Sequence, residues 1–169
     1  MISIDDPMLR WKPLPAWYPG PAAVWRDWLL GQGSLTRNLQ QLSHGQFRVE
    51  VLEEGWTHCR PARLRGLLDE PLSAQRMWSR KVVLMGQGRP WVTAHTLLPQ
   101  DSMNSPLKQV RKLRSRPLGA FLFKHPHLRR SRLLIARTPQ GWGRCSVFEL
   151  FDKPILVAEY FLPALIDKY

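Results

Sequence analysis

Hydrophobic and polar residues alternate along several stretches of the chain, as they do in half-buried strands. FRVEVLE at 47–53 alternates from end to end, while RMWSRKVVLM at 76–85 and WVTAHTLL at 91–98 flank a short loop with two glycines, as in a hairpin. Three later runs are RLLIAR at 132–137, CSVFELF at 145–151 and PILVAEYF at 154–161. Because consecutive strands with short connections pair with each other, the pattern predicts an antiparallel sheet.

Helix signals come in two pairs that interrupt these strands. The first pair covers residues 21–31 and 34–42, where Ser34 suits the N-cap of the second helix. The second pair covers 105–113 and 117–123, and proline stands near the start of both segments. Helices inserted in pairs, instead of alternating with strands, predict an α+β fold and not a doubly wound parallel one.

The first 24 residues follow neither pattern. Five prolines fall between Pro7 and Pro21, so residues 1–24 are expected to form an irregular arm, with Trp11, Trp17 and Tyr18 laid over the rest of the protein. At 169 residues the chain has the usual size of one domain and can bury a sizeable core. We therefore expect a single domain over residues 1–169.

Two charged residues stand inside otherwise apolar strand faces. Arg80 lies between Trp78 and Val82 on one face of its strand, and Glu159 shares its face with Phe161 in a strand that is apolar on both sides. Arg80 could lie along the sheet with its guanidinium in water. The two charges could also form a buried ion pair, or mark two ends of a pocket. We favour the pocket, because desolvation of a buried pair can exceed its Coulomb gain.

Such a pocket would suit a small hydroxylated acid. A guanidinium fork matches a carboxylate at one end, and a carboxyl group at the other end can bond a hydroxyl group or move a proton. The net charge of +12 also favours anionic partners. The basic segments 108–116 and 124–132 offer nucleic acid as an alternative partner, but their apolar residues are placed for packing. We expect this basic surface to steer an anionic substrate, with no nucleic acid bound.

The sequence predicts no redox-active cysteine pair, no metal site and no secretory signal. Cys59 and Cys145 have no C-x-x-C spacing and are expected to be reduced, structural thiols. His125 and His127 flank a proline without a third ligand nearby, so no metal site is predicted. The N-terminus lacks the pattern of a secretory signal, and no apolar run reaches the ~18 residues of a membrane span. We expect a cytoplasmic protein without a membrane span.

Five blocks of the sequence together point to a known family. They are WLLGQGSLTRNLQQ at 28–41, RMWSRKVVLMGQGRPW at 76–91, RPLGAFLF at 116–123, GWGR at 141–144 and KPILVAEYFLP at 153–163. In this order and spacing they resemble the bacterial chorismate pyruvate-lyase family, over nearly all of the chain from Trp25. The resemblance implies a single α+β domain in which an antiparallel sheet of about six strands and two helix-turn-helix flaps enclose the ligand. It also implies cofactor-free conversion of chorismate to 4-hydroxybenzoate and pyruvate, for ubiquinone synthesis, by a protein we expect to be a monomer.

The resemblance also assigns roles to residues. Arg80 corresponds to the family's carboxylate-binding arginine and Glu159 to the acidic residue at the ring-hydroxyl end, as general base or as hydroxyl-binding group. Leu118 corresponds to a flap residue whose backbone contacts the ligand. Leu35 corresponds to a ligand-lining position where better-known members have methionine. Cys145 departs from the family pattern, because a basic residue is expected there.

The same fold occurs as the effector domain of some helix-turn-helix repressors, so a small aromatic-acid sensor is an alternative function. Those proteins carry a separate DNA-binding domain ahead of the effector domain. The irregular residues before Trp25 do not resemble such a domain. We therefore expect the enzyme, with Arg80 and Glu159 as its catalytic residues.

Overall fold

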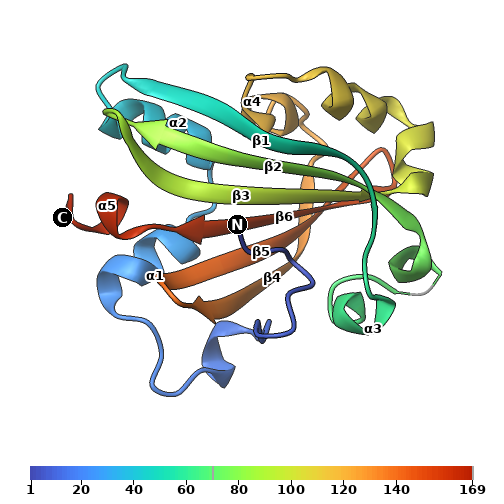
Figure 1. Ribbon diagram of the computed structural model, residues 1–169, viewed down its shortest axis with the longest axis horizontal. Helices are drawn as coiled ribbons and strands as arrows, with labels where there is room; N and C mark the ends of the chain where they lie inside the picture. The colour runs from blue at the N-terminus through green and yellow to red at the C-terminus, as the bar shows by residue number, and fades with distance from the viewer. Residues whose placement is uncertain (70, 169) are drawn as a thin grey trace.

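A six-stranded antiparallel sheet forms the centre of the computed structural model, which describes residues 1–69 and 71–168 (Figure 1). The strands β1, β2 and β3 follow one another across the sheet, and β6, β5 and β4 continue it beyond β3. The sheet therefore consists of two three-stranded meanders joined where β3 pairs with β6. The predicted α+β fold with about six antiparallel strands is confirmed. The strands are β1 (Phe47–His58), β2 (Arg76–Gly86), β3 (Arg89–Pro99), β4 (Arg129–Thr138), β5 (Gly141–Leu150) and β6 (Lys153–Phe161).

The hairpin predicted from the two glycines joins β2 to β3. Gln87 and Gly88 form its two-residue turn, with φ angles of 51° and 76°. Positive φ at both central residues is typical of a type I′ turn, whose twist matches that of the flanking strands. The register of the hairpin shifts by one residue between Met85 and Leu84, and beyond this shift Arg80 lies opposite Thr96 on β3.

Both predicted helix pairs are present. The first consists of α1 (Ala23–Leu29) and α2 (Leu35–Leu42), and the Ser34 Oγ accepts a hydrogen bond from the Arg37 N–H at 3.3 Å, as expected of an N-cap. The second consists of η4 (Pro106–Lys112) and α4 (Leu118–Leu122).

The η4 segment is a 3₁₀ helix, not an α-helix. Its buried residues, Leu107 and Val110, and the buried Leu113 that follows are spaced by three. That spacing matches the 3.0 residues per turn of a 3₁₀ helix.

The remaining helices are short; η1 lies in the N-terminal arm, and the others lie next to the ends of strands. They are η1 (Leu14–Ala16), α3 (Pro61–Leu64), η2 (Leu72–Ala74), η3 (Gln100–Asn104) and α5 (Pro163–Ile166). In the part of the chain that the structure describes, no helix is long and apolar enough to cross a membrane.

The N-terminal segment and the paired helices cover opposite faces of the sheet. In Figure 1 the segment near the N-terminus crosses the face toward the viewer, while α2 and α4 lie behind the sheet. Ile4 and Leu9 pack against Leu97 of β3 and Ala158 of β6, whereas Leu35 of α2 belongs to the core cluster on the other side. Each face of the sheet therefore has its own core.

The arm is held by specific contacts. Lys12 forms a β-bridge with Ile135 of β4, and the Trp17 Nε1–H donates to the Ile135 carbonyl oxygen at 3.0 Å. Trp11 and Trp17 pack against the two cores. Tyr18 does not, since 98% of it is exposed, so the expectation that it covers the domain is wrong.

Candidate functional site

A cavity lies between the sheet and the paired helices. Its volume is about 50 Å³. All four residues predicted for the site, Leu35, Arg80, Leu118 and Glu159, line it. Apolar side chains make up most of the remaining wall. The other lining residues are Gly33, Thr36, Val49, Val82, Leu84, Ala94, Thr96, Pro117, Gly119, Leu122, Phe123, Arg130, Arg144, Phe148 and Val157.

Arg80 projects into the cavity from the middle of β2. Its side chain is 2% exposed, so the alternative in which its guanidinium reaches water is wrong. The guanidinium is held from two sides: Nη1 donates to the Glu54 carboxylate of β1, and Nη2 donates to the Arg116 carbonyl oxygen at 3.0 Å. Two of the five N–H donors of an arginine are thereby used. The other three donors are able to bond a ligand carboxylate.

Sequence reasoning missed Glu54 because a β-bulge moves it to the cavity face. The register between β1 and β2 shifts between Val51 and Glu53, so that Glu53 pairs with Lys81 and Glu54 pairs with Arg80. A bulge inserts one extra residue, so the side chains beyond it change faces. Strict alternation from residue 47 would have placed Glu54 on the far side of the sheet.

Glu159 projects into the cavity from β6, and its side chain is 15% exposed. Its ion-pair partner is Arg144, which lies directly opposite on β5 and whose Nε–H donates to the Glu159 Oε2 at 2.5 Å. An ion pair between Arg80 and Glu159 is not formed, because each is paired with a residue of the next strand. In the described structure Oε1 of Glu159 has no hydrogen bond, so it is able to accept one from a ligand.

Arg144 also ties the sheet to the first helix pair. Its Nη1 donates to the carbonyl oxygens of Trp28, Leu29 and Gly31, at 3.1, 3.3 and 3.0 Å. These carbonyls lie at the C-terminal end of α1, where a cation satisfies acceptors that the helix leaves unpaired. The segment that leads from α1 to Leu35 is thus fixed to the same side chain that holds Glu159.

Arg144 could have been found by extending the alternation of β5 backwards. The glycines at 141 and 143 favoured a loop, but in the structure β5 begins at Gly141. Continuing the period of two from Phe148 through Ser146 leads to Arg144, on the cavity face.

The two helix pairs meet above the cavity. A Cβ on Gly119 of α4 would lie 2.6 Å from the Thr36 Oγ1 of α2, so glycine permits this close approach. Leu35 and Leu118 line the cavity from α2 and α4, which agrees with their predicted place in the flaps. Access to the cavity therefore depends on these helices.

The departure at Cys145 does not affect the cavity. Cys145 belongs to the core on the arm side of the sheet, where it pairs with Ala158 of β6. Cys59 and Cys145 are both free thiols. Burial, with a smaller contribution from Asp5, raises the pKa of Cys59 to about 12, and burial raises the pKa of Cys145 further. Neither thiol is suited to act as a nucleophile at neutral pH.

Within residues 1–69 and 71–168, no group of three or more His, Cys, Asp or Glu side chains is placed to hold a metal ion. The His125 ring instead packs edge-to-face between Phe121 and Phe151, at centroid distances of 5.3 and 5.2 Å.

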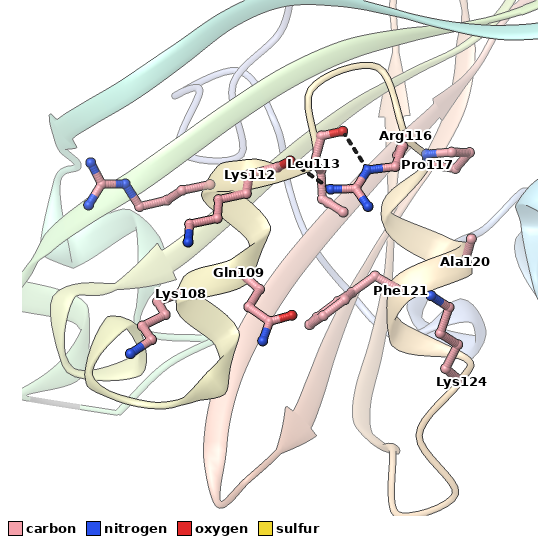
Figure 2. A pocket seen from close by; sticks show the side chains of 10 residues that line it. Lys108, Gln109, Lys112, Leu113, Arg116, Pro117, Ala120, Phe121 and Lys124 are labelled. Carbon is pink, nitrogen blue, oxygen red and sulfur yellow. Dashed lines mark hydrogen bonds between the residues drawn. The ribbon is translucent and has the colours of Figure 1, made fainter.

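A basic groove of about 680 Å³ lies outside the cavity, between η4 and α4. Figure 2 shows Gln109 and Phe121 pointing toward each other between the two helices, with Lys108 and Lys124 on either side. Five lysine and arginine side chains line the groove. The loop with Arg116 and Pro117 separates it from the cavity, since Pro117 lines both and the Arg116 carbonyl oxygen holds Arg80. The groove gives the outer surface of the second helix pair a positive field.

Comparisons with known proteins identify the family of this chain. The family model described as "Chorismate lyase" matches residues 14–169. A protein from Marinobacter nauticus named "Probable chorismate pyruvate-lyase" is 40% identical over 155 residues, covering 88% of this chain and 80% of that protein. The "Chorismate pyruvate-lyase" of Proteus mirabilis is 39% identical over 139 residues, covering 82% of this chain and 80% of that protein.

A solved structure with a looser likeness is the ligand-binding domain of a putative GntR-family transcriptional regulator from Bordetella bronchiseptica. Its TM-score is 0.48 at 15% identity, over 70% of this chain and 84% of that chain. The family model covers residues 14–169, and the two curated relatives are 39–40% identical over 82–88% of this chain. The chain belongs to the chorismate lyase family.

Proposed function

We propose that the protein is a chorismate pyruvate-lyase, which eliminates pyruvate from chorismate without a cofactor and supplies 4-hydroxybenzoate for ubiquinone synthesis. The observation that carries this proposal is the covered cavity with Arg80 and Glu159 in its wall, in a chain of the chorismate lyase family. The relatives named above as chorismate pyruvate-lyases support the same reaction.

The reaction needs orientation more than it needs strong chemical groups. The C3–O ether bond of the ring breaks, the hydrogen at C4 leaves as a proton equivalent, and the departing enolpyruvyl group gains a hydrogen at its methylene carbon to become pyruvate. The ring becomes aromatic, which drives the elimination. Correct positioning in such a case supplies about 7–11 kcal/mol of the barrier. A cavity shaped by packed helices and strands suits that task.

Arg80 binds the ring carboxylate in this proposal. Its guanidinium is held by Glu54 and by the Arg116 carbonyl oxygen, so its remaining donors are already oriented before the substrate arrives. A planar fork of this kind matches a carboxylate in two parallel hydrogen bonds.

Glu159 acts at the C4 end of the ring. Because Arg144 occupies Oε2, Oε1 is the oxygen that meets the substrate. It takes the C4 proton as a general base, or it bonds the C4 hydroxyl group while the hydrogen moves directly to the enolpyruvyl methylene. Chorismate deuterated at C4 separates the two routes: direct transfer carries the deuterium into the methyl group of pyruvate, whereas a general base exchanges it with water.

The ligand enters only if the cover moves. A cavity that holds a benzene ring measures roughly 150 Å³, and this cavity measures about 50 Å³. Leu35 and Leu118, or the helices that carry them, must therefore shift for a six-membered ring to enter. The flat product fits an apolar wall well, so its release is expected to be slow and the product to inhibit.

The direct test is turnover by purified protein. Chorismate is added in the presence of a metal chelator, 4-hydroxybenzoate is followed by chromatography, and pyruvate is followed with lactate dehydrogenase. We expect equal amounts of the two products. Folded protein without turnover, next to an active lyase in the same assay, would overturn the proposal, and 4-hydroxybenzoate binding without turnover would favour the sensor function.

A further inference from the structure

Arg130 differs from the other two arginines of the cavity. It lies on β4, opposite Phe148 of β5, and it lines the cavity with Arg80 and Arg144. Arg80 is paired with Glu54 and Arg144 with Glu159. Among the residues that the structure describes, Arg130 has no carboxylate partner, and its guanidinium carbon lies 5.0 Å from the centre of the Phe148 ring.

The Nε–H of Arg130 is a donor without an acceptor. This atom is buried and has no hydrogen-bond partner within the described residues, while Nη1 donates to the Gly31 carbonyl oxygen at 3.3 Å. A buried donor without an acceptor destabilises a fold, and native proteins contain few of them. Of the six buried side-chain atoms without a partner among the described residues, the Arg130 Nε is the one that belongs to a residue of the cavity wall, where a ligand can accept from it.

The charges at this end of the cavity also leave room for an anion. Arg130 and Arg144 both donate to the Gly31 carbonyl oxygen, so two guanidinium groups converge on one atom. Glu159 supplies one negative charge against these two positive charges. Burial and the charge of Arg144 lower the pKa of Arg130, and Glu159 opposes this only in part. One more carboxylate would compensate the remaining positive charge.

We propose that Arg130 binds the enolpyruvyl carboxylate of chorismate, an inference that rests on the proposed function. Chorismate is a dicarboxylate, and Arg80 accounts for only the ring carboxylate. In the sheet, β6 with Glu159 lies between β2 with Arg80 and β4 with Arg130. The ring would therefore place C1 toward Arg80, C4 toward Glu159 and the C3 substituent toward Arg130.

In this placement Arg130 binds a group that is present in the substrate and absent from the aromatic product. When the C3–O bond breaks, the carboxylate that Arg130 holds leaves with pyruvate. The product 4-hydroxybenzoate keeps only the carboxylate that Arg80 holds. Arg130 therefore distinguishes substrate from product, whereas Arg80 binds both.

The test compares Arg130→Gln and Arg130→Lys with Arg80→Lys as the matched variant. For Arg130→Gln we expect kcat/KM for chorismate to fall about tenfold to a hundredfold, the range for loss of a charged hydrogen bond, mainly through KM. The Kd of 4-hydroxybenzoate, from calorimetry, should change less than twofold. Arg130→Lys should recover part of the loss. Arg80→Lys should weaken chorismate turnover about tenfold to a hundredfold and weaken 4-hydroxybenzoate binding as well.

A binding measurement separates this inference from the proposed function. The probe is 3-(carboxymethoxy)-4-hydroxybenzoate, which adds a second carboxylate beside the C4 hydroxyl group. Wild-type protein should bind it more tightly than 4-hydroxybenzoate, and Arg130→Gln should abolish that preference without lowering the melting temperature by more than a few degrees. Turnover by wild type with no preference for the dicarboxylate, or equal loss of both ligands in Arg130→Gln, would overturn the role of Arg130 alone. Absence of turnover in wild type would overturn the proposed function.

Discussion

The two faces of the central sheet differ in the hydrogen-bond pairing of their buried polar groups. On the arm side, the His95 Nδ1 accepts from the Ile4 N–H at 3.0 Å, and its Nε2 lies 2.9 Å from the Ser79 Oγ. Because Nδ1 is an acceptor, the ring proton is on Nε2 and is donated to Ser79. This small network joins the N-terminal arm to β3 and β2.

On the cavity side, charged side chains are fixed by ion pairs but keep hydrogen-bonding atoms without partners. Glu159 has one oxygen bonded to Arg144 and the other without a partner, and the Arg130 Nε–H is unpaired. The same strands thus carry mostly paired polar groups on one face, where the Tyr160 hydroxyl group is an exception, and partly paired charged groups on the other. The cavity differs because its unpaired atoms belong to the charged side chains Arg130 and Glu159, which are able to bond a ligand.

Glu159→Gln is expected to have the largest effect, and that effect should be on catalysis. If Glu159 is the general base, kcat should fall about 10²- to 10⁴-fold, because the amide cannot accept the proton. The amide oxygen still accepts from Arg144, which keeps its three carbonyl partners. We therefore expect the free energy of unfolding to fall by only about 1–3 kcal/mol. Steady-state kinetics and urea unfolding measure the two quantities.

The matched control for this variant is Glu54→Gln. Glu54 also pairs with a buried arginine, but it lies at the Arg80 end of the cavity and does not line it. Its replacement should raise KM more than it lowers kcat. A kcat for Glu159→Gln within threefold of wild type, together with a collapsed melting temperature, would give Glu159 a structural role like that of His95.

The stability that His95 contributes on the arm side should depend on pH. Burial, with a smaller effect of Lys81, lowers the pKa of His95 from 6.5 to about 3. Between pH 6.5 and pH 3 the unfolded chain binds a proton at His95, whereas the folded protein does not. The stabilisation from the neutral ring is therefore complete above pH 6.5 and is lost as the pH falls toward 3. From pH 6.5 to 4.5 the contribution to the free energy of unfolding should fall by about 2–3 kcal/mol. Urea unfolding of wild type and His95→Gln at both pH values measures it.

His127→Gln serves as the control, because this histidine is exposed in a loop and its loss should leave the slope unchanged. The His95 variant should be less stable than wild type at pH 6.5 and should lose less stability on acidification. Equal slopes in wild type and His95→Gln would show that the Ser79–His95–Ile4 network does not depend on a neutral ring.

The sequence predicted the sheet because alternation is local, and it found the charges that stand in apolar faces. Arg80 and Glu159 could be recognised in this way. Their partners could not, because each depends on strand order and register: β3 lies between β2 and β6, so Arg80 and Glu159 do not pair.

Bulges, register shifts and glycines in the strands prevented the sequence pattern from predicting the remaining site residues. Glu54 follows a bulge in β1, Arg130 precedes a register shift in β4, and Arg144 follows two glycines that favoured a loop. At each of these positions the period of two fails or is masked, so only the three-dimensional pairing places the side chain.

The smallest effect is expected at Tyr160, the residue next to Glu159. Successive strand residues face opposite sides, so Tyr160 lies in the arm-side core, 2% exposed, with its ring 6.2 Å from that of Trp11. Its buried hydroxyl group has no hydrogen-bond partner in the described structure, unlike the His95 ring on the same face. Tyr160→Phe removes this hydroxyl group and leaves the ring, so the free energy of unfolding should be unchanged or rise by about 0–1 kcal/mol. Because the ring does not line the cavity, kcat/KM should stay within twofold of wild type. Urea unfolding and chorismate turnover check both expectations, and a loss of more than about 1 kcal/mol would show that the hydroxyl group has a partner after all.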